Sequence, residues 1–221
     1  MIRRLRVVGL ILGLSVMGMG VNPADAWAGK SKDQITLVGI ASFDEVFSEA
    51  KSVDDALTNA RKQRHQARKN VNSVMGLDKK TAFGDALNEL NQRANGKVKV
   101  AMKGNTPSLS VSDAVPTNVQ EAIDAVNSAI SLYSSLAKEL QDVPPRCKAA
   151  VKKAKKLEVS ELKDELGGFT LNISELRERI DTVKQFKTNL EVTAGLPKKA
   201  QNLISNLAGD VQAVSSVFPG L

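Results

Sequence analysis

The only histidine of the chain, His65, lies in the strongly basic stretch LTNARKQRHQARKN at residues 57–70. An imidazole can act as a general base or a metal ligand, but either role needs an orienting carboxylate or further ligands. The sequence neighbours of His65 are instead the cations Arg61, Arg68 and Lys69. At about 100° per residue they share the outer arc of a helix with it. We interpret this stretch as a solvated basic face, and Arg61, Arg68 and Lys69 as candidate residues of a partner or anionic-surface patch.

The single cysteine, Cys147, stands between Arg146 and Lys148 in the first turn of a predicted helix. Helix dipoles and neighbouring cations lower the pKa of a thiol, so Cys147 is a candidate free thiol, either reactive or bridged to another chain. It also shares an apolar arc with Ala150 and Leu157, and there it would be buried like a small hydrophobic side chain. We favour burial. One cysteine allows no disulfide within the chain.

The predicted helix that carries Cys147 is also the best candidate for a partner surface. Its basic arc consists of Lys148, Lys152, Lys155 and Lys156. Basic amphipathic helices can bind anionic membranes, but they usually insert large apolar side chains, and this one offers mostly alanine. Packing against another protein, or against a second copy, is therefore our first interpretation, and an anionic membrane surface is the alternative. We expect no nucleic-acid partner, because no aromatic side chains alternate with the lysines.

The chain contains little that could support catalysis. One histidine and one cysteine do not make a zinc site, and the sequence has no glycine-rich phosphate loop, G-x-S-x-G or H-E-x-x-H motif. The acidic residues fall on the polar faces of periodic helices, where solvation is the default. We expect a protein that is not an enzyme and has no cofactor, no metal ion and no small-molecule substrate.

The first 28 residues predict a cleaved signal peptide. MIRRLR is basic, residues 7–21 are apolar, and Ala26-Trp27-Ala28 fits the cleavage rule, so we expect cleavage after Ala28. The expected destination is the periplasm or the cell exterior. No cysteine at the cleavage point predicts a lipid anchor, and no later segment is apolar enough to predict a transmembrane helix. The whole chain is basic, with a formal net charge of +7.

After this segment we expect a leader over residues 29–41, poorly ordered or forming a short strand, and then one helical domain over residues 42–221. Ser42 and Glu45 form a capping-box pattern that predicts the start of a long helix ending at Gly76. A shorter helix is predicted over residues 79–94. Residues 97–112 alternate apolar and polar side chains about a Gly-Asn-Thr-Pro turn, which predicts a β-hairpin. The inward row expected for the first helix is Val46, Ala50, Val53, Leu57, Ala60, Arg64, Ala67, Val71 and Val74.

Helical periodicity returns after the hairpin. One helix is predicted from residue 116 or 117 to 140, and another from Pro144-Pro145 to Leu166 with a joint near Ser160. The NISE motif at 172–175 predicts a helix that ends at a turn around Gly195 and Pro197 and precedes a last helix. The inward row expected before that turn is Leu176, Ile180, Val183, Phe186, Leu190 and Ala194. These elements predict an all-α fold, an elongated antiparallel bundle of about five long helices and one short helix with a small β-hairpin near 97–112.

The charges of two predicted helices run in opposite order. The first half of residues 42–76 is acidic and the second half basic, whereas the helix from Pro144 starts with lysines and ends with carboxylates. We therefore predict that these two helices lie parallel and adjacent, so that acid meets base along both halves. Exposed ion pairs contribute only about 0–1 kcal/mol each, so such pairing would set register more than stability.

Two resemblances bear on function. VPTNVQEAIDAVNSAI, residues 115–130, resembles a short segment of phage tail-fibre proteins, which implies only a capped amphipathic helix. The layout of long helices with a small hairpin is similar to that of pore-forming toxins that carry a β-tongue, although this hairpin bears lysines and serines. Our leading interpretation is a helical protein-interaction or structural module of the bacterial envelope. The alternatives are a membrane-active helical protein and a basic periplasmic holdase chaperone, which would need an open apolar cavity.

Overall fold

The computed structural model describes residues 34–104, 106–167 and 172–218. They belong to one compact unit, Asp33–Leu221. The predicted signal peptide, residues 1–28, and residues 29–33 of the expected leader lie outside the described part of the chain. Within the described part, six helices and one small antiparallel sheet confirm the predicted all-α bundle with a hairpin.

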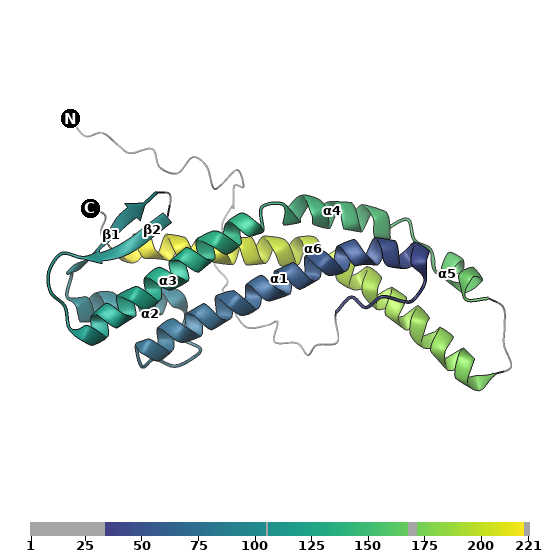
Figure 1. Cartoon of the computed structure of the whole chain (residues 1–221), viewed down its shortest axis with the longest axis horizontal. Coiled ribbons are helices and arrows are strands. Elements are labelled where there is room, and N and C mark those ends of the chain that lie inside the picture. The colour runs from purple at the N-terminus through teal and green to yellow at the C-terminus, as the bar shows by residue number, and fades with distance from the viewer. Residues whose placement is uncertain (1–33, 105, 168–171, 219–221) are drawn as a thin grey trace, which may run out of the picture. The chain divides into compact units, whose positions relative to one another are not determined.

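The elements follow one another along the chain in a simple order (Figure 1). The helices are α1 (Ala41–Val74), α2 (Phe83–Ala94), α3 (Thr117–Glu139), α4 (Val143–Ala154), α5 (Val159–Glu165) and α6 (Ile173–Val217). The strands β1 (Val98–Lys103) and β2 (Thr106–Val111) lie between α2 and α3.

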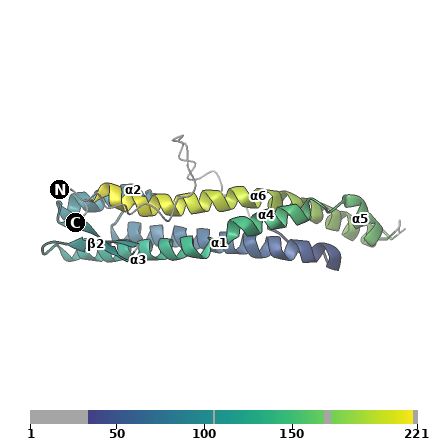
Figure 2. The ribbon, with the colours of Figure 1, turned by 90° about the horizontal axis from the view of Figure 1, so that it is seen from above.

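Three long legs build the bundle. They are α1, α6 and the succession of α3 and α4, and each packs against the other two. α1 and α6 run in the same direction, and α3 and α4 run opposite to both (Figure 1). Contacts between α1 and α6 advance together along both helices, with Phe43 against Phe186, Asp54 paired with Lys199 and Arg64 paired with Asp210. Seen from above, α6 lies in one layer and α1 and α3 in the other (Figure 2).

The core is a continuous cluster of aliphatic and aromatic side chains from all three legs. Phe186 of α6 is buried edge-on against Phe43 and Phe47 of α1, with ring centroids 5.3 and 5.7 Å apart. Elsewhere in the core, Phe83 of α2 meets Tyr133 of α3, with ring centroids 5.4 Å apart. Aromatic contacts therefore fasten the start of α1 to α6, and a further aromatic pair joins α2 to α3.

α1 begins differently from the prediction. Its N-cap is Ile40, which offers no side-chain cap, so the predicted capping box of Ser42 and Glu45 is wrong. The carboxylate of Asp44 instead accepts the backbone N–H groups of Val38 and Gly39 at 2.7 and 2.9 Å. A carboxylate in the first turn of a helix also suits the helix dipole.

The described part of the expected leader, residues 34–40, is held against α6. The side-chain amide of buried Asn189 accepts the N–H of Thr36 at 3.1 Å and donates to its carbonyl oxygen at 2.6 Å. Ile35 beside it is only 3% exposed. One asparagine thus supplies to an extended segment both hydrogen bonds that a neighbouring strand would supply.

The inward row predicted for α1 is confirmed in its middle. Ala50, Val53, Leu57, Ala60 and Val71 are buried. Val46, Arg64 and Ala67 are only half-buried, and Val74 is exposed.

The predicted turn at Gly195 and Pro197 is wrong, because both residues lie inside α6, a continuous helix of 45 residues. The nitrogen of Pro197 carries no hydrogen, so the carbonyl of Thr193 loses its usual helical donor. Burial on both sides of Pro197 continues without a break, through Leu196 and Ala200, and this packing holds the helix together. The predicted start is confirmed, since the Asn172 side chain accepts the N–H of Ser174.

The helix predicted from Pro144 to Leu166 is divided. α4 ends at Ala154, and α5 begins at Val159 behind a capping box made by Glu158 and Glu161. We predicted a joint near Ser160, and the structure places it slightly earlier, between Ala154 and Val159.

The predicted parallel packing of α1 and the lysine helix is also wrong, because α4 runs opposite to α1 (Figure 1). One pair joins them, Arg146 Nε to Glu49 Oε1 at 2.8 Å, with Arg146 also donating to Ser52. The antiparallel direction places the later lysines of α4 beside the start of α1, so the charge order of the two helices does not determine their pairing.

The predicted hairpin is confirmed, with Val98 opposite Val111 and Lys103 opposite Thr106. It is attached to α3 by Asn127, whose amide accepts the N–H of Leu109 at 2.7 Å and donates to its carbonyl at 2.9 Å. This repeats, on another leg, the way in which Asn189 holds Thr36. β2 therefore lies against α3, and β1 forms the outer strand of the pair.

Candidate functional site

The first eleven residues of α6, 173–183, carry large apolar side chains at the surface; we call this segment the α6 arm. Ile173, Leu176 and Ile180 are 68%, 38% and 45% exposed, and Val183 is half-buried. At 1.5 Å per residue the arm is roughly 16 Å long. Our prediction that Leu176 and Ile180 face the core is wrong.

The arm lies beyond the point where α1 begins. The first turn of α1 reaches Phe186 through the ring of Phe43, and the arm precedes Phe186 along α6. α5 packs beside this part of α6, and Arg179 donates to the carbonyl of Gly167 just after α5, at 3.1 Å. The apolar face of the arm is exposed because the leg that covers the rest of α6 starts too late to cover it.

Two rows of side chains run along α6. The core row is buried or half-buried at alternating steps of three and four: Phe186, Asn189, Thr193, Leu196, Ala200, Leu203, Leu207, Asp210 and Val214. Continued backwards at the same steps, it reaches Thr182, Arg179 and Glu175, which are polar. The apolar side chains of the arm belong to a second row, one position further along the chain. We call it the outer row: Ile173, Leu176, Ile180, Val183, Lys187, Leu190, Ala194 and Pro197.

The two rows explain the failed prediction. The inward row that we predicted joins members of both, because Val183 belongs to the outer row and Phe186 to the core row. A helix that packs on one face along its length alternates steps of three and four. Ile180, Val183, Phe186 and Asn189 follow one another at three consecutive steps of three, and this is the signal in the sequence that the packed face changes.

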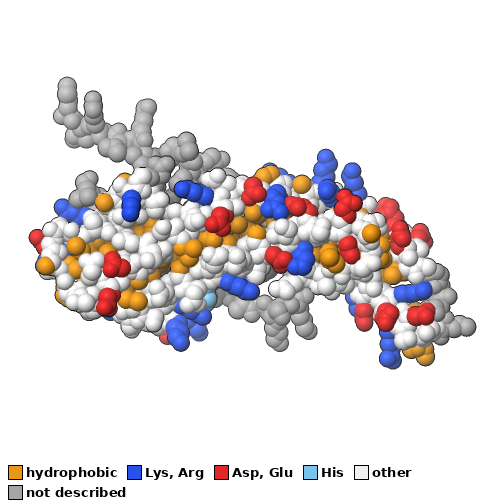
Figure 3. Space-filling view, viewed as in Figure 1, with side chains coloured by type: hydrophobic (Ala, Val, Ile, Leu, Met, Phe, Trp, Pro, Cys, Tyr) orange, Lys and Arg blue, Asp and Glu red, His pale blue; other side chains and the backbone are white. Residues whose placement is uncertain are grey.

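The lysines of α4 and of the two residues that follow it form the second part of the candidate site. Lys148, Lys152 and Lys155 line one depression with Val151 and with Pro197 of α6, and its volume is about 370 Å³. Lys156 lies exposed beside it, one residue further along the chain. Figure 3 shows cationic side chains projecting from the surface over α4. Three of the four lysines predicted for this patch therefore converge on one hollow.

These lysines differ from the cations that join the helices of the bundle. Lys199, Arg64 and Arg146 reach carboxylates of other helices at 3.1, 2.7 and 2.8 Å. Within the described part of the chain, none of the five lysines between residues 148 and 156 pairs with a carboxylate. The structure thus leaves a concentrated positive charge beside Pro197, at the inner end of the outer row.

The cations predicted on α1 form a separate patch. Arg61 is exposed, whereas Arg68 and Lys69 are half-buried. A guanidinium nitrogen of Arg68 lies 3.3 Å from Nδ1 of His65, so the one histidine is a neighbour of a cation, as its sequence context indicated. This part of α1 lies near Tyr133, whose hydroxyl donates to the carbonyl of Arg64, and not near α4. The predicted patch residues therefore belong to two surfaces.

Cys147 is buried, with no exposed surface, on the face of α4 that packs into the bundle. Burial raises the pKa of its thiol, and the nearby charge of Arg146 opposes this only in part. A buried thiol with a raised pKa is a poor nucleophile.

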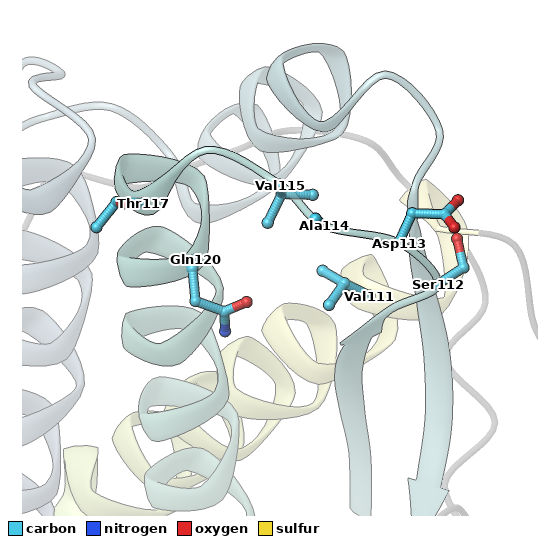
Figure 4. A pocket seen from close by; sticks show the side chains of 7 residues that line it. All are labelled: Val111, Ser112, Asp113, Ala114, Val115, Thr117 and Gln120. Atoms are coloured by element: carbon cyan, nitrogen blue, oxygen red, sulfur yellow. The ribbon is translucent and has the colours of Figure 1, made fainter.

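A second hollow, of about 560 Å³, lies between the end of β2 and the start of α3. Figure 4 shows Val111, Val115 and Gln120 around it, while the side chains of Ser112 and Asp113 lie on the far side of the loop. Asp113 is its only ionisable lining residue. Its lining offers no pair of groups that could transfer a proton or hold an ion between them.

No group of three or more His, Cys, Asp or Glu side chains among the described residues is arranged to hold a metal ion. None of the described helices combines the length and apolar character needed to cross a membrane.

Comparisons with known proteins add no relative. No protein-family model matches the chain, and neither the curated proteins nor the solved structures give a significant match.

Proposed function

We propose that this protein is a non-enzymatic interaction module of the bacterial envelope, which binds a helix of another protein along the α6 arm. The observation that carries the proposal is the exposed apolar row of Ile173, Leu176 and Ile180 on a helix whose remaining length is packed. Export follows from the predicted signal peptide and is part of the proposal.

The spacing of the arm supports a helical partner. Ile173, Leu176, Ile180 and Val183 follow one another at steps of three, four and three, the pattern of a helix that packs along one seam. Ile and Leu at such positions are costly to leave in water, since each fully buried aliphatic side chain contributes about 1.5–3 kcal/mol. A short seam of this kind suits a reversible contact better than a permanent one.

Photo-crosslinking in intact cells tests the proposal. A benzophenone amino acid placed at Ile173 of the whole chain should give an adduct that mass spectrometry identifies as a different polypeptide. The matched control is Val74, an exposed valine near the end of α1, which should give none. No adduct at Ile173, or an adduct with lipid or a second copy alone, would contradict the proposal.

A second candidate function, binding to an anionic membrane surface, is favoured by the lysines between residues 148 and 156, none of which pairs with a carboxylate of the described residues. Each cation near such a surface contributes about 1 kcal/mol. Flotation with anionic and neutral vesicles over a salt series separates the two candidates. Binding to anionic vesicles that salt abolishes would support the second candidate, and absence of binding at low salt would remove it.

A further inference from the structure

The cations on the two sides of α4 have different surroundings. On the side that faces α1, Arg146 reaches the carboxylate of Glu49 at 2.8 Å. The side that faces α6 lines a depression, which we call the lysine depression and which consists of Lys148, Val151, Lys152, Lys155 and Pro197. Its lining therefore contains three cations and no carboxylate, and Figure 3 shows cations projecting from the surface over α4.

The carboxylates that lie nearest to these lysines along the chain are engaged elsewhere. Before the lysines, Asp142 pairs with Arg146 at 3.7 Å. After them, Glu158 forms the capping box of α5 with Glu161. Neither end of the lysine cluster therefore provides a carboxylate that pairs with it, and the described residues place none of the three lysines in an ion pair.

The wall of the depression formed by α6 is not acidic either. Glu191 is the carboxylate nearest to Pro197 in the sequence of α6. At about 100° per residue it lies about 120° around the helix from Pro197, and Lys198 falls on the same side. The one nearby carboxylate of α6 therefore lies away from the depression and has a cation on its own side of the helix.

The three lysines are spaced so that one small ligand can reach all of them. Steps of four and three residues place neighbouring side chains on one helix face, with Cβ atoms about 5–6 Å apart. Lys148 and Lys155 are roughly 10 Å apart along the helix axis. Like charges at this spacing destabilise a helix, and a bound anion would remove the repulsion. The cluster therefore favours a ligand of high negative charge.

The size of the depression selects among anions. Its volume of about 370 Å³ suits a small molecule or a headgroup and not a folded helix. A carboxylate brings one negative charge, whereas a phosphate monoester brings about 1.5 to 2 at pH 7 together with three acceptor oxygens. Lysine ammonium groups bind phosphate as point charges. Two phosphate groups would therefore balance three lysines in this volume, and Val151 and Pro197 would contact the uncharged part of the ligand.

We infer that the lysine depression binds a ligand with two or more phosphate groups, which are held by Lys148, Lys152 and Lys155. Two sources share this chemistry, a phosphate-bearing lipid headgroup and a soluble polyphosphate. The inference goes beyond the helix-binding function proposed for the α6 arm and does not depend on it. With a lipid headgroup as the ligand, it gives the second candidate function a defined point of contact.

Inorganic triphosphate is the probe that tests the inference. Isothermal titration calorimetry measures its binding to the protein purified from cells that express the whole chain. The protein should bind one triphosphate at low salt, about tenfold or more tightly than orthophosphate, and the affinity should fall as salt is raised. Absence of binding at low salt, or equal affinities for triphosphate and orthophosphate, would overturn the inference.

A triple substitution locates the site. Lys148→Gln, Lys152→Gln and Lys155→Gln together should weaken triphosphate binding by about tenfold or more. The matched control is Lys62→Gln, Lys79→Gln and Lys103→Gln, which makes the same change of net charge at exposed positions outside α4 and α6 and should keep the affinity.

Thermal unfolding of both variants separates loss of binding from loss of folding. Both should unfold cooperatively, and triphosphate should raise the midpoint of the control and not that of the depression variant. Equal weakening of triphosphate binding in the two variants would show that net charge, and not the lysine depression, binds the anion, and would overturn the inference.

Vesicle flotation identifies the source of the phosphates. Flotation with anionic vesicles that the depression variant loses and the control keeps would assign the phosphates to a lipid headgroup. Binding of triphosphate without flotation would assign them to a soluble ligand, and either result supports the inference. Failure of triphosphate binding would leave the crosslink expected at Ile173 unchanged, so the two proposals fail separately.

Discussion

α6 contains two regions that differ in their surroundings and in the polarity of their side chains. From Phe186 to Val214 the helix lies between α1 and the leg of α3 and α4, and its core row contains Asn189, Thr193 and Asp210. From Ile173 to Val183 it has no α1 beside it, and its row is aliphatic throughout. The row of side chains in the buried region is therefore more polar than the row of side chains in the exposed region.

This difference shows that burial along a helix is decided by its neighbours and not by its own hydrophobicity. Two of the three polar members of the core row have a partner that explains their place in it. Asn189 holds Thr36, and Asp210 accepts from Arg64 at 2.7 Å. Asp54 of α1, which is only 4% exposed, likewise pairs with Lys199 of α6. Ile173, Leu176 and Ile180 of the arm stay exposed in the described chain, which is why we propose that another protein covers them.

The largest effect is expected at the border between the two regions. Phe186→Ala removes a fully buried ring that meets Phe43 and Phe47, and such a deletion costs about 3–5 kcal/mol because a cavity remains. Urea unfolding followed by circular dichroism measures it. A loss below about 1 kcal/mol would mean that the packed region of α6 does not begin at Phe186.

Asn189→Ala should cost about 1–3 kcal/mol, because both backbone groups of Thr36 lose their hydrogen-bond partner in a partly buried place. Hydrogen exchange should show the amide of Thr36 exchanging faster. Asn127→Ala is the matched control, since it releases Leu109 of the hairpin in the same way and should leave Thr36 protected. Unchanged protection of Thr36 in the Asn189 variant would rule out the hydrogen bonds as its anchor.

Alkaline pH should lower the free energy of unfolding of the protein through Tyr133 of α3, the only tyrosine of the chain. Burial, and secondly the charge of Asp210, raise its pKa in the folded state far above the ordinary value of 10.0. Above pH 10 the unfolded state releases the phenolic proton and the folded state keeps it, so stability falls by about 1.4 kcal/mol per pH unit from this group. Lysines also titrate there, so the measurement is the difference between the native protein and Tyr133→Phe in urea unfolding at pH 8 and 11. Equal losses in both proteins would contradict a buried, neutral Tyr133.

Thr193→Val should stabilise the protein by about 1 kcal/mol. The hydroxyl oxygen of Thr193 is buried without a hydrogen-bond partner among the described residues, and valine has nearly the same shape without the unsatisfied group. Differential scanning calorimetry would record a higher midpoint. A lower midpoint would indicate that the hydroxyl has a partner in solution, such as a bound water molecule.

The sequence predicts the elements well and their surroundings less well. The 3.6-residue periodicity, the Gly-Asn-Thr-Pro turn and the cap at Asn172 follow from local rules, and each is found close to its predicted place. The turn predicted at Pro197 does not form, because buried Leu196 and Ala200 pack on either side of the proline and hold the helix together. The local signals for helix ends do not include this tertiary packing.

The candidate site was predicted only in part. Lys148, Lys152 and Lys155 share a surface because they share a helix face, which periodicity reveals. Exposure of Leu176 and Ile180 depends on where α1 begins relative to Phe186, and the sequence of α6 alone does not contain this information. The direction of α4 against α1 is likewise set by the connection through α3, and not by the charges of the two helices.

The most direct test of an unoccupied arm is the stability of the double variant Leu176→Ala and Ile180→Ala. Alanine favours the helix and little buried contact is lost, so the free energy of unfolding in urea should change by less than about 1 kcal/mol for the two substitutions together. A loss of about 3 kcal/mol or more, as two buried aliphatic side chains would give, would show that the arm is already packed within the protein and has no face left for a partner.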